Sequence, residues 1–448
     1  MNLMKNDYFY SYKQIWKVAY PILLSLIMEQ MIGMTDTAFL GRVGEIELGA
    51  SAIAGVFYLV IYMVGFGFSV GAQIIIARRN GEYRYDQTGN IFYHGLFFLL
   101  AVAFIIIGCS EAFAPSILGM TVNSNAIAAA AGSYVTYRLP GLVFAYMTAM
   151  FRAFYIGTTQ TKTLTLNSII MVLSNVCFNW VLIFGKFGIE PMGIKGAAIG
   201  SSLAELVSLI FFILYTLNKT DIVKYGLNHF SKFSFKTLGE ILSVSIWTMI
   251  ANVVSLSTWL IFFVSIEHLG ERHLAVSNII RSLSGLLWMV LMAFATTGSS
   301  LVSNLIGNGH PDSVKGLTIR IMKMSYAAIA VMILIMLSFP TTVISIYTDI
   351  PDLINASIPA LFVLCASYIV TVPANVFCQA VAGTGSTNIT FTMEIISLAI
   401  YMAYCFVVIN LMHLSVAACW TAEFAYGIPM MLLCGWYLLS GRWKGKAI

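Results

Sequence analysis

Charged side chains are scarce in this sequence of 448 residues. Asp, Glu, Lys and Arg make up 10% of the chain, 59% of it is hydrophobic, and the mean hydropathy is +0.87. Water-soluble globular domains carry about 25% charged residues, so the sequence does not belong to that class. The apolar runs are long and do not alternate in polarity, which also excludes an outer-membrane barrel.

Motifs of catalysis and metal binding are missing as well. The seven cysteines form no CxxC pair and no disulfide framework, so we interpret them as small buried hydrophobic residues. The six histidines lie in or near loops or span ends, and no HExxH or GxSxG arrangement occurs. The stretch Gly65-Phe66-Gly67 lacks the Lys-Ser/Thr pair of a phosphate-binding loop. We therefore expect no cofactor, and a membrane-embedded enzyme is the least favoured alternative.

What the sequence does contain is a series of long apolar segments. A helix needs about 20 residues to cross a hydrocarbon core of about 30 Å, and only helices satisfy the backbone within each such span. The fold class is thus an all-α polytopic membrane protein. Residues 1–7 lack the apolar stretch and cleavage site of a secretory signal, so we expect the first span to be retained. We predict twelve spans, at about 14–39, 48–77, 89–110, 126–156, 163–185, 194–217, 237–266, 275–306, 317–347, 353–382, 388–411 and 414–440.

The orientation follows from the distribution of Lys and Arg, because cytoplasmic loops retain positive charge. Seventeen of these residues fall on one side of the predicted spans and four on the other, namely Arg42, Lys186, Lys195 and Arg272. We therefore expect both termini in the cytoplasm and the protein in the cytoplasmic (inner) membrane. The bias also explains the net charge of +5, with no need for a nucleic-acid partner.

The sequence also indicates an internal repeat. The most polar internal segment, 218–236, has six predicted spans on either side. The turn at 41–45 is matched in order by one at 269–272, and the opening of the sixth span at 193–198 by that of the twelfth at 414–420. We predict an N-lobe at 1–217, a cytoplasmic linker at 218–236 and a C-lobe at 237–448. Six spans per lobe make the repeat parallel, an arrangement that places substrate sites near the midplane.

Asp36 is the most informative single residue, because it lies deep in the first apolar run. A carboxylate in the hydrocarbon layer costs about 2.5–3.5 kcal/mol, so such residues usually face a protein interior or a water-filled cavity and have a function. Glu29 lies two helical turns earlier on nearly the same face. Pro21 removes a helix hydrogen bond and favours a bend in this span. We interpret Asp36 as a functional acid on a helix that moves.

A set of residues in the first half of the chain matches the pattern of a known family. These residues are Pro21, Gln30, Asp36-Thr37, Gly41, Gly44, Arg152 through Gly157, Lys162, Asn175, Asn179, Ile183-Phe184-Gly185, Pro191-Met192-Gly193-Ile194 and Gly196-Ala197-Ala198. With them the chain resembles the multidrug and toxic compound extrusion (MATE) family, over nearly its whole length. The resemblance implies a twelve-helix, two-lobed, V-shaped exporter with a central cavity, which exchanges inward-moving H⁺ or Na⁺ for outward-moving organic cations.

The resemblance also implies a cation site in the N-lobe. Asn175 and Asn179 are four residues apart and therefore share a helix face. In the family the matching positions join the first-helix aspartate, with a Ser or Thr near Ser201 on the sixth span. If the coupling ion is Na⁺, Asp36, Asn175 and Asn179 are the expected metal ligands. A proton on Asp36 suits the same site, and amides that merely join helices are the structural alternative.

Several other polar residues lie inside the predicted spans. Glu29, Gln30, Arg281, Glu394 and Glu423 are candidates for the substrate cavity or for coupling. An isolated Arg in a membrane seeks a carboxylate, so we expect Arg281 to pair with Glu394 or Glu423. Glu205 and Arg138 are interpreted as packing partners. The repeat places Phe262 opposite Asp36, and we expect no C-lobe sodium site.

The sequence thus predicts a secondary active multidrug exporter driven by H⁺ or Na⁺. We expect a monomer surrounded by membrane lipid, with a drug or organic cation as its small-molecule substrate. A flippase for a lipid-linked precursor is the alternative, although it would carry more cationic residues in its cavity to meet phosphates.

Overall fold

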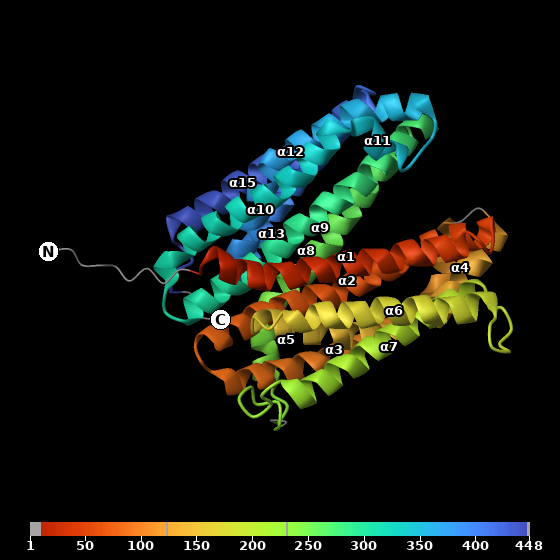
Figure 1. Cartoon of the computed structure of the whole chain (residues 1–448). Helices are drawn as coiled ribbons and strands as arrows, with labels where there is room; N and C mark the ends of the chain where they lie inside the picture. Colours follow the sequence, from red (N-terminus) through yellow and green to blue (C-terminus); the bar gives the residue numbers. More distant parts are fainter. Residues whose placement is uncertain (1–9, 122–123, 230–231, 446–448) are drawn as a thin grey trace. The chain divides into compact units, whose positions relative to one another are not determined.

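Figure 1 shows the computed structural model of the chain, which describes residues 10–121, 124–229 and 232–445. Every regular element in these ranges is a helix. The elements are α1 (Tyr12–Leu40), α2 (Glu45–Gly81), α3 (Tyr85–Thr121), α4 (Asn125–Arg138), α5 (Gly141–Gly157), α6 (Lys162–Phe184), α7 (Ile194–Lys219), α8 (Phe235–Glu267), α9 (Glu271–Gly307), the 3-10 turn η1 (Pro311–Ser313), α10 (Val314–Ser338), α11 (Pro340–Ser345), α12 (Pro351–Gly383), α13 (Thr387–Cys405), the π-helical stretch η2 (Phe406–Leu411), α14 (Val416–Trp420) and α15 (Ala422–Ser440).

The helices confirm the polytopic fold. Among the described residues, eleven helical segments are long and apolar enough to cross a membrane. The pair α4 and α5, bent by 54° at its break, makes the number twelve when it is counted as one span. Large apolar side chains lie exposed along these segments, such as Phe104 and Ile105 of α3, which are 61% and 65% exposed. Such exposure is expected of helices that face lipid rather than water.

The chain divides after Ala19 and after Met249 into two compact units. We call the unit from Tyr20 to Met249 the N-terminal unit and the other the C-terminal unit. Both divisions fall inside helices, α1 and α8, whereas the predicted lobes meet in the linker at 218–236. The lobe bounds 1–217 and 237–448 stay a prediction.

In the N-terminal unit, α2 packs against α3, α4 and α5, while α6 and α7 run side by side (Figure 1). Two glycines of α2 allow a close approach to the first part of α8. A Cβ added at Gly67 would lie 2.6 Å from Cα of Met249, and one at Gly71 would overlap Ser245. Small residues at such contacts let membrane helices pack backbone against backbone.

In the C-terminal unit, α12 packs against both α9 and α15, and α13 packs against α15. Proline lies inside two of these helices, at Pro359 and Pro373 of α12 and at Pro429 of α15. Membrane helices tolerate such positions because neighbouring helices and hydroxyl side chains satisfy the freed backbone groups.

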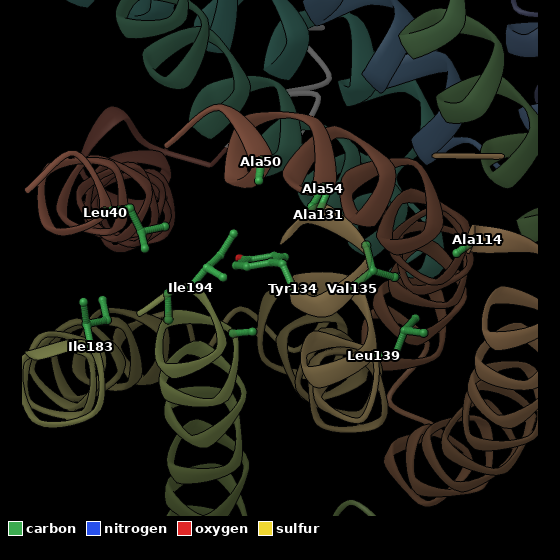
Figure 2. Packing of buried hydrophobic residues seen from close by; sticks show 12 residues of the cluster. Leu40, Ala50, Ala54, Ala114, Ala131, Tyr134, Val135, Leu139, Ile183 and Ile194 are labelled. Atoms are coloured by element: carbon green, nitrogen blue, oxygen red, sulfur yellow. The ribbon is translucent and has the colours of Figure 1, made fainter. Parts of the chain in front are cut away.

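A cluster of buried apolar residues lies in the N-terminal unit, drawn from α1, α2, α3, α4, α6 and α7 (Figure 2). In Figure 2 the ring of Tyr134 from α4 points toward Ile194 at the start of α7. Three further members, Leu40, Ile183 and Ala197, lie one helical turn from the predicted site residues of their own helices. This cluster therefore borders the site described next.

Candidate functional site

Asp36 lies on α1 and accepts hydrogen bonds from two other helices of the N-terminal unit. The side-chain amide of Asn179 on α6 donates to its Oδ1 over 2.5 Å. The hydroxyl of Ser201 on α7 donates to its Oδ2 over 3.2 Å. Both carboxylate oxygens are thus bound by groups that only tertiary packing brings to this helix. We call this arrangement, together with Asn175, the Asp36 site.

The two asparagines of α6 complete the network. Asn175 donates from Nδ2 to Ser201 Oγ over 3.1 Å, and Asn179 donates from Nδ2 to Asn175 Oδ1 over 3.3 Å. Both asparagines are fully buried, and Ser201 is 5% exposed. The structure therefore brings together all four residues that the sequence predicted for an ion site.

One oxygen of the Asp36 site has no hydrogen-bond donor. Oδ1 of Asn179 is buried and unpaired among the described residues. A buried carbonyl without a partner costs about 1–3 kcal/mol, so this oxygen, which lies beside a carboxylate, is available as a further ligand. Gly200 of α7 faces this atom, and a Cβ at that position would overlap it. The carboxylate, amide and hydroxyl oxygens here are hard ligands of the kind that suit Na⁺, and Asp36 itself suits a proton.

A buried ion pair lies next to this site and was not predicted. Arg138, the last residue of α4, binds Glu205 of α7 through two contacts, Nη1 to Oε2 over 2.8 Å and Nη2 to Oε1 over 2.5 Å. The two residues are 8% and 6% exposed. Both were expected to be packing partners, but not of each other. The sequence did contain an indication of such pairs, because Arg and Glu occur in similar numbers inside the predicted spans and each is stabilised there by an opposite charge.

A second ion pair joins Glu29 of α1 to Arg152 of α5. Ser25 donates to Oε1 of Glu29 over 3.2 Å and lies 2.7 Å from the hydroxyl of Ser168 on α6. Glu29 thus contacts an arginine and a serine rather than the Asp36 site. Its neighbour Gln30 is exposed.

Pro21 lies inside α1, which is helical on both sides of it. The hydroxyl of Thr165 on α6 donates to the Pro21 carbonyl over 3.2 Å. This contact links the proline-containing turn to the helix that carries Asn175 and Asn179. The expected bend at Pro21 stays a prediction.

In the C-terminal unit the expected pairing of Arg281 is wrong. Its guanidinium lies 5.8 Å from the ring centres of Trp259 and of Phe263, both on α8. Within the described residues, no ion pair joins it to Glu394 or Glu423. Aromatic faces attract a guanidinium through their quadrupole, which explains how Arg281 is accommodated without a carboxylate.

Glu394 and Glu423 are the other polar candidates of the C-terminal unit. Among the described residues, neither forms a hydrogen-bond network like that around Asp36. Glu394 on α13 accepts a hydrogen bond from Ser255 of α8, and Glu423 is half-buried at the start of α15. Phe262, the residue that the repeat places opposite Asp36, is 2% exposed. It packs among aromatic rings, with Tyr401 at 6.0 Å and Trp420 at 5.8 Å.

The fold and the site together define a polytopic membrane protein with a buried network of carboxylate, amide and hydroxyl groups inside its helices. Comparison with known proteins gives the family. The MatE family model matches residues 21–181 and 245–407, more than half of the chain. The chain therefore belongs to the MatE family of membrane transporters, as the resemblance predicted.

Individual relatives agree with this assignment. The chain is 24% identical to a probable multidrug resistance protein NorM of Thermotoga maritima, over 97% of this chain and 94% of that protein. It is also 24% identical to a probable NorM of a Synechocystis species, over 77% of this chain and 74% of the relative.

Among solved structures, the chain is similar to the eukaryotic MATE transporter AtDTX14. The TM-score is 0.85 at 18% identity, over 96% of each chain. An outward-facing multidrug resistance MATE transporter of the MOP superfamily gives a TM-score of 0.86 at 18% identity, over 97% of each chain. At these identities the likeness establishes the fold.

Proposed function

We propose that the protein is a secondary active multidrug exporter, which moves lipophilic or cationic organic compounds outward in exchange for H⁺ or Na⁺. The observation that carries this proposal is the Asp36 site, where one carboxylate from α1 meets two amides of α6 and a hydroxyl of α7. The names of the NorM relatives, which are multidrug resistance proteins, support the choice of substrate class.

The site suggests how an ion changes the protein. Empty, the Asp36 carboxylate is held by Asn179 and Ser201. A bound proton removes its charge, and Na⁺ would compete for the same oxygens and for the free Oδ1 of Asn179. Either event alters the contacts that tie α1 to α6 and α7. Coupling by this route requires that the ion-bound and ion-free states of the protein differ in their affinity for the substrate.

The available energy is sufficient for export. One elementary charge that crosses 100 mV supplies about 2.3 kcal/mol, which supports roughly a fifty-fold gradient of a neutral solute. We propose alternating access of two lobes, 1–217 and 237–448, joined by the linker 218–236. The protein would act as a monomer in the inner membrane with both termini cytoplasmic, as the Lys and Arg bias predicts.

The two ion pairs of the N-terminal unit argue against a flippase. Arg138 and Arg152 are each neutralised by a glutamate, Glu205 and Glu29. Arginines engaged in this way are not available to bind the phosphates of a lipid-linked precursor. The acidic Asp36 site is better suited to cationic cargo and ions.

The test is substrate efflux from proteoliposomes, with a pH gradient and a sodium gradient imposed separately. Asp36→Asn should abolish efflux driven by the coupling ion while the protein keeps its melting temperature. The control Glu111→Gln removes an exposed carboxylate from α3 and should leave efflux intact. Ion-driven efflux at the wild-type rate in the Asp36 variant would overturn the proposed switch.

A further inference from the structure

The ion pair of Arg138 and Glu205 is built into a break between two helices. α4 ends at Arg138, α5 begins at Gly141, and their axes bend by 54°. Pro140 lies in the break, where it lacks the backbone N–H that would continue the helix. A Cβ at Gly141 would lie 2.5 Å from both Nη1 of Arg138 and Oγ of Ser202. The glycine thus leaves the space through which the guanidinium reaches α7.

The pair is enclosed by neutral phenols. The guanidinium of Arg138 lies 4.1 Å from the ring centre of Tyr58, whose hydroxyl is 3.5 Å from Oε1 of Glu205. Tyr62 of α2 and Tyr134 of α4 also interact electrostatically with both members of the pair. Three uncharged phenols thus lie beside the pair.

The pair is connected to the Asp36 site through adjacent residues of α7. Arg138 Nη1 donates to Ser202 Oγ over 3.3 Å, and the preceding residue, Ser201, donates to Asp36. Arg138 also acts electrostatically on Asp36. Tyr134, a member of the apolar cluster of Figure 2, acts electrostatically on both Arg138 and Asp36.

Stability alone gives little reason for such a pair. Buried ion pairs can be replaced by apolar residues of similar volume at little or no loss of stability, because desolvation offsets the attraction. The charges of Arg138 and Glu205 cancel, so that Asp36 is left as the one uncompensated charge of this group. A single cation at Asp36 then makes the group neutral.

We propose that Arg138 and Glu205 are positioning residues that set the affinity of the Asp36 site for its coupling cation. This inference rests on the proposed function, in which Asp36 binds that ion. Glu205 holds the guanidinium on α7 and neutralises it, which prevents Arg138 from occupying the Asp36 carboxylate or repelling the incoming cation. Within about 10 Å, at an effective dielectric constant of about 20, one unbalanced charge changes a binding constant by roughly tenfold or more.

The experiment is an ion titration of the purified full-length protein in lipid nanodiscs. Na⁺ is titrated at fixed pH, and pH is titrated without Na⁺, with tryptophan fluorescence as the readout, since Trp180 directly follows Asn179. Glu205→Gln should weaken binding of the coupling ion by roughly tenfold or more. Glu205→Asp, which keeps the charge, should stay within about threefold of the wild type.

The double variant Arg138→Met/Glu205→Gln separates charge from packing, because it removes both charges together. It should return the affinity to within about threefold of the wild type. Double-variant binding as weak as that of Glu205→Gln, or wild-type affinity in folded Glu205→Gln, would overturn the inference. If Glu205→Gln does not fold, Arg138→Met replaces it: this change leaves the Glu205 charge unbalanced and should tighten cation binding by roughly tenfold, and wild-type affinity would overturn the inference. The control Glu82→Gln removes a carboxylate from the Arg79 ion pair beyond α2 and should not change the affinity.

Failure of this inference is distinguishable from failure of the proposed function. If Asp36→Asn abolishes ion binding but folded Glu205→Gln binds normally, the ion switch stands and the role of the pair is overturned. If Asp36→Asn still binds the ion, Asp36 is not the ion site, and the proposed switch and this inference both fall.

Discussion

Asn179 donates a hydrogen bond of 2.5 Å to Asp36 across 143 positions of sequence. The contact ties the first helix of the N-terminal unit to the helix that carries both asparagines. The oxygen of the same Asn179 amide, Oδ1, is buried and has no hydrogen-bond donor among the described residues. One side chain thus both holds the carboxylate and offers a free ligand beside it.

Replacement of Asn179 distinguishes the two coupling ions. Asn179→Ala removes the free oxygen ligand but leaves the carboxylate, so Na⁺-driven efflux should fall about tenfold or more while any H⁺-driven efflux is retained in part. The measurement is efflux from proteoliposomes under each gradient. The matched control is Asn167→Ala, since Asn167 is buried on the same helix but accepts its hydrogen bond from Ser208. Equal effects of both variants on Na⁺-driven efflux would contradict the prediction.

Replacement of Gly200 tests whether the space around Oδ1 of Asn179 is needed for ion binding. A methyl group at this position would overlap Oδ1 of Asn179, so Gly200→Ala should displace the amide and weaken ion binding by roughly tenfold. The loss is measured by titration of the ion in nanodiscs. Gly108→Ala on α3 is the control, because nothing lies within 4 Å of a Cβ built there. An unchanged ion affinity in Gly200→Ala would show that the amide is not held where the structure places it.

Removal of one partner from the ion pair of Glu29 and Arg152 should destabilise the protein. Glu29→Gln leaves Arg152, whose side chain is 14% exposed, without its carboxylate. Breaking a fully buried pair costs about 3–5 kcal/mol. Because the side chain of Glu29 is 35% exposed, we expect a smaller loss here, about 1–3 kcal/mol. The measurement is thermal unfolding in detergent. The added change Arg152→Met should recover most of the loss, and a double variant no more stable than Glu29→Gln would argue against the charge explanation.

His94 of α3 should hold the part of the predicted linker that directly precedes α8. Its Nδ1 lies 2.8 Å from the Asn90 carbonyl, which can only accept, so this nitrogen carries the hydrogen. Its Nε2 therefore accepts from the backbone N–H of Ser234 over 2.8 Å, and the ring stacks on Phe233 at 5.1 Å.

Loss of these contacts should expose the linker to proteolysis. His94→Ala removes both hydrogen bonds and the stacking, so tryptic cleavage near Lys232 should be roughly fivefold faster. The rate is followed by gel electrophoresis of the protein in nanodiscs. His229→Ala, a change of an exposed histidine in the same linker, should cleave at the wild-type rate. Identical rates in all three proteins would mean that His94 does not hold this segment.

Much of the site was predictable because helical spacing is a local property. Asn175 and Asn179 share a face by their separation of four residues, and the depth of Asp36 in an apolar run makes it a candidate for a functional role. The resemblance to the family then placed Ser201 with them. The pairing of intramembrane charges was not predictable in the same way, since Arg138 and Glu205 lie 67 positions apart and several acids compete for each arginine.

The error at Arg281 has the same origin. From the sequence, a carboxylate was the expected partner, but two aromatic rings of α8 occupy the space beside the guanidinium. The sequence does not show which of these side chains lies beside Arg281, because that depends on how the helices pack.

The sequence by itself determined the all-helical, membrane-spanning fold, the acid in the first span and the family, because hydrophobic length and local spacing depend on the order of residues alone. Only the tertiary structure decided which side chains meet. It placed Asn179 and Ser201 on the two oxygens of Asp36, left one amide oxygen free, and set a neutral ion pair beside them. These are contacts between helices, and their geometry depends on how the helices pack.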